Sequence, residues 1–189
     1  MRITAFSGSP RVNGNTRALV DEVVRGAGSG GAECEVVDIG RLRIAPCRAC
    51  SSCRRTGECI QRDDMQSLYP KLIESDVLVF GTPVYFWGAS AQMKAFVDRW
   101  YAIAEGDASE KLRGKKALVV TAYADTDPDT PEHVVGMFRR ALDYLGIELV
   151  GVLGVSASDP GDAASNAQAM QEAFSLGQAL REYPQTTWE

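Results

Sequence analysis

The sequence contains only one histidine, His133, among 189 residues. This count argues against a zinc site built from histidines and against a Ser-His-Asp triad. Long hydrophobic runs are also missing, since no apolar stretch approaches the about 18 residues of a membrane span. Positive charge is not in excess either, because the net charge is −5. We therefore expect no nucleic-acid partner and no membrane association.

The composition is that of an ordinary globular protein. Apolar residues make up 45% and charged residues 24% of the chain, and this length fits one domain over residues 1–189. A strand-like run at residues 3–6 directly follows Met1 and Arg2, which leaves no room for a signal peptide. We therefore expect a soluble, cytoplasmic protein.

Short apolar runs alternate with stretches of helical periodicity along most of the chain. This alternation predicts a three-layer α/β/α sandwich around a parallel sheet. Five strands favour the flavodoxin-like order 2-1-3-4-5. The one long irregular stretch is residues 40–64, and loops of this length usually carry function. Strands are predicted at residues 3–7, 34–38, 77–80, 117–121 and 148–155, and helices at residues 15–26, 65–75, 91–103, 131–145 and 163–182.

The loop after the first strand is rich in hydrogen-bond donors and leads directly into a helix. Ser9, Asn15 and Thr16 supply side-chain donors and Arg11 a positive charge, while the helix start supplies free backbone amides. The same residues are also ordinary helix caps. Ligands in such sheets bind at the carboxyl ends of the strands, which favours a phosphate site.

Two further loops are expected at the same edge of the sheet. Tyr85, Phe86 and Trp87 follow the third strand, and three adjacent aromatic residues suit a planar heterocycle. An interface or core anchor is the alternative. The fourth strand ends near residues 121–123, which are expected to close a third side.

Two motifs resemble the NADPH-dependent FMN reductase superfamily of flavodoxin-like proteins. They are Gly-Ser-Pro-Arg-x-x-Gly-Asn-Thr at residues 8–16 and Thr-Pro-Val-Tyr-Phe-Trp-Gly at residues 82–88, the latter followed by Ser-Ala-Gln-Met-Lys-Ala-Phe-Val-Asp-Arg. The resemblance implies FMN as cofactor, and a homodimer or homotetramer. No side chain stands out as an acid or base catalyst, which suits chemistry centred on a flavin. The implied phosphate ligands are Ser9, Arg11, Asn15 and Thr16, and the implied ring contacts are Pro83, Val84, Tyr85, Phe86, Trp87, Thr121, Ala122 and Tyr123.

Four of the five cysteines, Cys47, Cys50, Cys53 and Cys59, are closely spaced. Disulfides between them would close almost no loop, so a metal or redox site is the better interpretation. Structural zinc usually takes two Cys-x-x-Cys pairs that are farther apart. The spacing, with the Asp-Asp-Met that follows at residues 63–65, resembles the compact motif of iron–sulfur flavoproteins and implies a [4Fe–4S] cluster. Bound zinc, or cysteines without a cluster, remain alternatives.

The segment around these cysteines is strongly basic. Residues 41–62 contain six arginines and a single acid, Glu58. Positive charge near thiolates lowers their pKa and offsets cluster charge. It would also steer an acidic electron donor such as a ferredoxin. NAD(P)H is the alternative donor.

These observations lead to an expected function and three alternatives. We expect an FMN-dependent oxidoreductase that passes electrons between its flavin, a [4Fe–4S] cluster and an external partner or small-molecule substrate. The first alternative is a cluster-free NAD(P)H-dependent FMN or quinone reductase. The second is a dedicated dehydrogenase in a biosynthetic pathway, for example of an aminated chorismate derivative. The third is an electron carrier without enzymatic activity.

Overall fold

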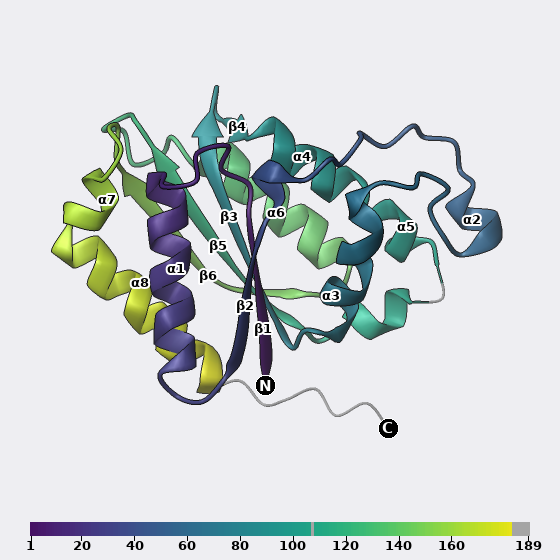
Figure 1. Cartoon of the computed structure of the whole chain (residues 1–189), viewed down its shortest axis with the longest axis horizontal. Coiled ribbons are helices and arrows are strands. Elements are labelled where there is room, and N and C mark those ends of the chain that lie inside the picture. The colour runs from purple at the N-terminus through teal and green to yellow at the C-terminus, as the bar shows by residue number, and fades with distance from the viewer. Residues whose placement is uncertain (107, 183–189) are drawn as a thin grey trace.

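A computed structural model describes residues 1–106 and 108–182, so the expectation of one domain over residues 1–189 extends beyond the described chain. Figure 1 shows a central twisted sheet with helices on both faces. The five main strands are parallel, in the order β2-β1-β3-β5-β6. The predicted α/β/α sandwich with a flavodoxin-like parallel sheet is therefore confirmed.

The elements follow the predicted alternation. The strands are β1 (Arg2–Ser7), β2 (Glu33–Asp38), β3 (Val77–Tyr85), β4 (Gly88–Ala89), β5 (Lys116–Tyr123) and β6 (Glu148–Ser156). The α-helices are α1 (Asn15–Gly28), α2 (Cys53–Thr56), α3 (Leu68–Glu74), α4 (Ala91–Asp98), α5 (Tyr101–Ala104), α6 (Glu132–Tyr144), α7 (Asp162–Ser165) and α8 (Ala167–Ala179). Short 3₁₀ turns are η1 (Ile39–Arg41), η2 (Asp64–Ser67), η3 (Ser109–Leu112) and η4 (Leu180–Glu182).

Each face of the sheet has its own hydrophobic core. On one face, α1 and α8 cover small and branched side chains of β1, β3 and β5. On the other face, an aromatic cluster packs under the remaining helices, with Phe6, Phe80, Phe96, Trp100 and Phe138 in contact as rings. Because both faces are covered, the central strands β3 and β5 have continuous apolar runs, as the sequence predicts for a parallel sheet.

The structure corrects the predicted strand count. The third strand continues to Tyr85 and turns back through the short antiparallel strand β4, which the sequence analysis did not predict. The sheet order is therefore 2-1-3-5-6 and not 2-1-3-4-5, although the five parallel strands keep the expected neighbours. The extra strand was missed because a two-residue strand has no periodicity of its own.

Two predicted helices are interrupted. The helix predicted at residues 91–103 ends at Asp98 and resumes at Tyr101, with Arg99 between the two parts. The helix predicted at residues 163–182 breaks at Asn166, whose side chain accepts a hydrogen bond from the Ala169 amide and caps α8. Asparagine competes with helical hydrogen bonding in this way, and the apolar pattern alone does not reveal it.

A helix that crosses a membrane must be both long and predominantly apolar. In the described part of the chain, none combines the required length with sufficient hydrophobicity.

Candidate functional site

The three loops expected to hold a ligand follow β1, β3 and β5 at one edge of the sheet (Figure 1). Ser7 pairs with Gly81, and Pro83 with Ala122, so the strands end side by side. The Gly8 amide donates to the Gly81 carbonyl at 2.7 Å and continues this pairing into the first loop. The parallel register therefore brings the predicted segments together.

The first loop, residues 8–14, ends in an open helix start. The buried Ser9 hydroxyl accepts from the Arg11 amide and donates to the Arg11 carbonyl, both at 3.2 Å. Gly14 precedes α1 without a side-chain cap, and the first amide to bond back to it is that of Ala18. The amides of residues 15–17 thus have no acceptor within the described chain. Together with the helix dipole they supply hydrogen-bond donors and positive potential of the kind that favours an anion.

Asn15 has a different position from the one predicted. Its amide nitrogen donates to the carbonyls of Ala157 and Asp159 at 3.1 and 2.9 Å. Its oxygen accepts from the amides of Gly161 and Ala163 at 3.1 and 3.2 Å. Both donors and both lone pairs are occupied, so this side chain anchors the loop after β6 to the start of α1 and is not free to bind a phosphate.

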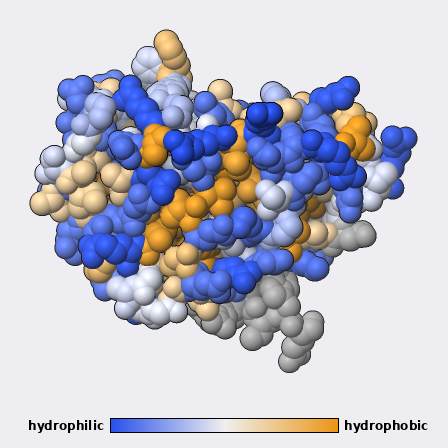
Figure 2. All heavy atoms as spheres, in the orientation of Figure 1, coloured by the Kyte–Doolittle hydropathy of each residue, from blue (hydrophilic) through white to orange (hydrophobic). Residues whose placement is uncertain are grey.

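The aromatic segment forms a hairpin and not an open loop. Pro83, Val84 and Tyr85 are the last residues of β3, and Phe86 and Trp87 form the turn to β4. The turn residues have φ values of 48° and 59°, a left-handed conformation that is strained for bulky side chains and found most often at functional sites. Phe86 is 95% exposed. Figure 2 shows a projection at the top of the molecule, where Figure 1 places the turn between β3 and β4.

The third predicted segment is less accessible. Thr121, Ala122 and Tyr123 are the last residues of β5, and all three are buried. The Thr121 hydroxyl donates to the Leu153 carbonyl, and the Tyr123 carbonyl accepts from the Ala157 amide at 2.7 Å. These side chains are buried in the core. A ligand at this edge of the sheet would therefore contact the loop that follows β5.

Three serines that support this edge were not predicted. The Ser90 hydroxyl donates to the Gly8 carbonyl at 2.7 Å and so joins the start of α4 to the first loop. The hydroxyls of Ser156 and Ser158 donate to carbonyls of the loop after β5 at 2.6 and 3.0 Å. Only Ser90 has a recognisable sequence signature, because serine before a helical run is a typical N-cap. The partners of the other two lie more than thirty residues away.

The four clustered cysteines lie in the cysteine loop, residues 42–63. Cys47 and Cys50 are exposed, Cys59 is half-buried and Cys53 is buried at the start of α2. All four line a single pocket together with Arg99. Within residues 1–106 and 108–182, no three His, Cys, Asp or Glu side chains come close enough to hold one metal ion. The structure therefore gathers the thiols around a shared space without the spacing of a mononuclear site.

The backbone of the cysteine loop is tightly curved. Ala49 and Ser51 have positive φ values of 51° and 54°, and Gly57 ends α2 in the left-handed conformation. Side-chain-bearing residues adopt this conformation at a cost of about 1–3 kcal/mol each. The curvature turns the three i, i+3 cysteines toward one pocket.

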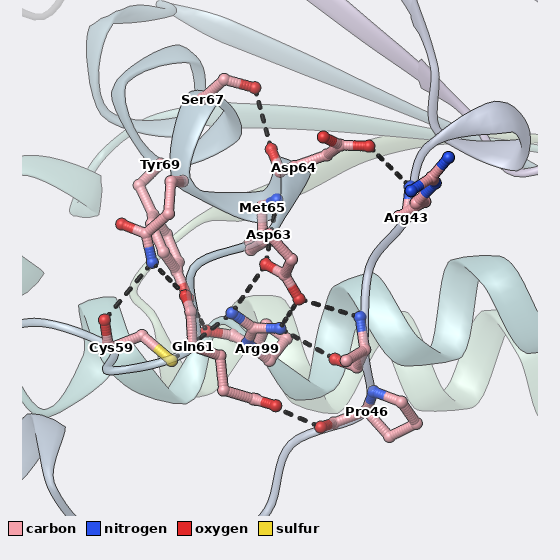
Figure 3. Close-up of polar contacts among 12 residues, drawn as sticks. Arg43, Pro46, Cys59, Gln61, Asp63, Asp64, Met65, Ser67, Tyr69 and Arg99 are labelled. Atoms are coloured by element: carbon pink, nitrogen blue, oxygen red, sulfur yellow. Dashed lines mark hydrogen bonds and ion pairs between the residues drawn. The ribbon is translucent and has the colours of Figure 1, made fainter.

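Arg99 is the central contact of the cysteine loop (Figure 3). Its side chain is only 1% exposed. One terminal nitrogen donates to the Ala45 carbonyl at 2.8 Å and to Asp63 Oδ2 at 2.7 Å. The other donates to Asp63 Oδ1 at 3.1 Å and to Cys59 Sγ at 3.4 Å. One guanidinium therefore joins both ends of the loop to a cysteine sulfur.

Further hydrogen bonds connect the two ends of the loop, as Figure 3 shows. Asp63 Oδ2 accepts from the Ala45 amide at 2.9 Å, and Asp64 accepts from the Arg43 amide at 2.7 Å. The Gln61 side chain donates to the Pro46 carbonyl at 3.2 Å. The entry and exit of the loop are thus fixed relative to each other.

The ionisable groups of this region are perturbed by their surroundings. Burial raises the pKa of Asp63, but hydrogen bonds from Arg99 and from the Ala45 and Met65 amides outweigh it and hold that pKa below its usual range. Burial also raises the pKa of the Cys53 thiol, and the neighbouring cysteines add to the effect. The Asp63 carboxylate is therefore the ionised partner of Arg99 at neutral pH.

A second, larger pocket lies on another side of Cys59. Its volume is about 580 Å³, within the range of small-molecule sites. Tyr69, Arg62 and Gln66 contribute polar groups, and Ile73 contributes an apolar surface. Cys59 belongs to the walls of both pockets.

Sequence reasoning missed the role of Arg99. The residue lies on the side of the predicted helix 91–103 that carries Phe96 and Trp100, which are both buried. A charged side chain at a position of the apolar stripe was the available indication, because such a residue is buried only with a partner. Its partner Asp63 is 36 residues away, so the pairing has no local pattern.

Comparisons with known proteins agree with this architecture. Residues 1–181 match the family model described as NADPH-dependent FMN reductase. An iron–sulfur flavoprotein of Archaeoglobus fulgidus is 34% identical over 96% of this chain and 80% of its own. An iron–sulfur flavoprotein of Methanocaldococcus jannaschii is 38% identical over 52% of this chain, and the match covers about half of that relative's length. The structure of an NAD(P)H:quinone oxidoreductase from Methanothermobacter marburgensis, 19% identical, superposes with a TM-score of 0.78 over 99% of both chains.

The fold is flavodoxin-like, and the match to the family model makes the chain a flavin-dependent oxidoreductase. The chain belongs to the NADPH-dependent FMN reductase family and, within it, to the iron–sulfur flavoproteins.

Proposed function

We propose that this protein transfers electrons between an FMN at the sheet edge, a [4Fe–4S] cluster in the cysteine loop and an external partner. The observation that carries the proposal is the shared pocket of Cys47, Cys50, Cys53 and Cys59, with the Arg99 guanidinium 3.4 Å from the Cys59 sulfur. The iron–sulfur flavoprotein names of the relatives support the same conclusion.

For FMN, the residues of the first loop and the hairpin have suitable chemistry. The open amides of α1 would hold the phosphate, with Ser9 shaping the loop, Arg11 adding charge and Thr16 lining the helix start. The hairpin residues Pro83, Val84, Tyr85, Phe86 and Trp87 would lie against the ring. We assign Asn15 to positioning, because its hydrogen bonds are all internal.

For the cluster, the donor set and its spacing fit a cubane. A cubane takes four thiolates, each on a different iron, so its ligands stand farther apart than those of one metal ion. What supports the proposal is that the four thiols line one pocket. Structural zinc instead usually takes two Cys-x-x-Cys pairs that lie farther apart in the sequence, a pattern that this loop lacks.

The chain's own residues would then have distinct tasks. FMN, when bound, supplies hydride and single-electron chemistry that side chains lack. The helix start binds the phosphate, the hairpin orients and covers the ring, and Arg99 compensates the negative charge of the thiolates. This chemistry does not require an acidic or basic side chain beside the flavin.

The proposal includes partners. NAD(P)H and a small-molecule acceptor follow from the family, and the arginines of the cysteine loop suit an acidic donor such as a ferredoxin. The exposed hairpin aromatics suit an interface within a homodimer or homotetramer in the cytoplasm.

A cluster-free NAD(P)H-dependent quinone reductase is the second candidate. The specific observation in its favour is the structural likeness to the Methanothermobacter marburgensis oxidoreductase, which has a closely similar fold. In that case the cysteine loop would have no redox role.

The deciding experiment measures iron, acid-labile sulfide and FMN in protein purified without oxygen. We expect about four irons and four sulfides per flavin. Flavin without iron, together with rapid reduction by NADPH, would support the quinone reductase and reject the cluster.

A further inference from the structure

We propose that Arg99 is a positioning residue that assembles the cysteine loop before iron is bound and then raises the reduction potential of the cluster through Cys59. The effect on the reduction potential rests on the proposed function. The assembly of the cysteine loop depends only on contacts within the chain itself.

The case begins with the burial of a charge. Arg99 is 1% exposed and Asp63 15%, and they form a two-pronged ion pair at 2.7 and 3.1 Å. Buried ion pairs seldom add net stability compared with apolar residues of the same size. In addition, the Arg99 Nε has no hydrogen-bond partner among the described residues, which is a further cost. A purely structural position would be filled better by an apolar side chain.

The contacts of Arg99 indicate what the charge does. Its other bonds reach Ala45 at the entry of the cysteine loop and Cys59, the last thiol of the motif. The loop contains only the four-residue helix α2, so few backbone bonds of its own hold it. Arg99 therefore fixes the distance between its ends and holds one sulfur in place without any metal.

The same geometry has an electrostatic consequence. Hydrogen bonds to the sulfur ligands of a cluster help to set its reduction potential. A guanidinium at 3.4 Å from Cys59 Sγ favours the more negative, reduced state. Removing the guanidinium should therefore shift the midpoint potential to a more negative value.

Three variants separate these effects. Arg99→Met removes the charge but keeps much of the apolar stem. Arg99→Lys restores the charge without the planar fork. Arg99→Met with Asp63→Asn avoids an unpaired carboxylate and serves if the single variant folds poorly. Arg140→Met is the control for the loss of one positive charge, since Arg140 is an exposed residue of α6 outside the cysteine loop.

The first measurement is hydrogen exchange in the iron-free protein. The amides of Arg43, Ala45 and Asp64 bond across the ends of the loop. In Arg99→Met we expect them to exchange about tenfold faster or more, the range for losing a hydrogen bond to a charged group. Arg140→Met should exchange like the wild type. Unchanged exchange in Arg99→Met and in the double variant would overturn the positioning role.

The second measurement is an EPR-monitored redox titration after reconstitution with iron and sulfide. Arg99→Met should have a more negative midpoint potential, Arg99→Lys should recover part of the shift, and Arg140→Met should match the wild type. A wild-type potential in Arg99→Met with a full cluster would overturn the electrostatic role. If the wild type itself takes up no iron, the proposed function fails, while the exchange result still decides the positioning role.

Discussion

The loop after β1 and the cysteine loop both leave regular secondary structure, but different side chains hold them. At the sheet edge, the neutral amide of Asn15 bonds four backbone groups of residues 157–163. In the cysteine loop, the ion pair of Arg99 and Asp63 joins the ends. The helix start already provides positive potential for an anion, so a neutral anchor suffices there. The thiols of the cysteine loop have only the four-residue helix α2 beside them, so a nearby cation is needed to offset the charge of the thiolates.

The substitution with the largest expected effect should change the cysteine loop and leave the sheet edge unchanged. Cys50→Ser should lose essentially all cluster iron while FMN binding stays unchanged, because Cys50 belongs to the cysteine pocket and not to the sheet edge. Iron and flavin analysis of anaerobically purified protein measures both. Cys34→Ser is the control, since Cys34 lies in β2, outside that pocket. Loss of FMN together with iron would contradict the independence of the sites.

The converse substitution is Asn15→Ala, with the next largest effect. It leaves several buried backbone groups without a partner, which costs about 2–4 kcal/mol in unfolding free energy. FMN affinity should fall roughly tenfold or more, since the first loop loses its anchor. Denaturant unfolding and flavin fluorescence titration measure these quantities. Asn13→Ala, at an exposed position of the same loop, should change neither.

As pH falls, we expect the hydrogen bonds across the cysteine loop to weaken at a higher pH than those at the sheet edge. The folded-state pKa of Asp63 is lowered, so its contribution to stability is complete above its unfolded value of about 4. It is lost as pH falls through the lower folded value. In iron-free protein, protection of the Ala45 amide should decrease over that range, after correction for intrinsic exchange. The Gly8 amide, bonded to a carbonyl, is the reference and should show no such step.

The variant Asp63→Asn tests whether Asp63 is the group that titrates in this acid step. This variant should have a weakly protected Ala45 amide at neutral pH and no further loss in acid. An acid step that survives the substitution would show that another group titrates.

The smallest expected effect concerns the strained hairpin. Trp87 has a φ of 59°, a conformation that glycine adopts freely. Trp87→Gly should raise the unfolding free energy by about 1 kcal/mol relative to Trp87→Ala, because both lose the ring and only glycine relieves the backbone. Both variants should bind FMN more weakly. Equal stability of the two variants would mean that the turn carries no strain.

The fold was largely predictable, and the site only in part. Apolar runs such as Val79 and Phe80 in β3 indicated buried parallel strands, and β3, β5 and β6 lie where periodicity placed them. The breaks after Asp98 and at Asn166 were not predictable, because both interrupt a helix without changing the apolar pattern. The burial of Thr121 also escaped prediction, since the exact end of a strand depends on its neighbour β6.

The sequence by itself determined the parallel sheet, the loops at its carboxyl edge and the close spacing of four thiols. These features depend on periodicity and on neighbours a few residues apart. Only the tertiary structure decided that Asn15 anchors a loop more than 140 residues away and that Arg99 joins Asp63, Ala45 and Cys59. Such partners are chosen when the chain packs, because a buried polar group must be satisfied by whatever segment the fold brings beside it.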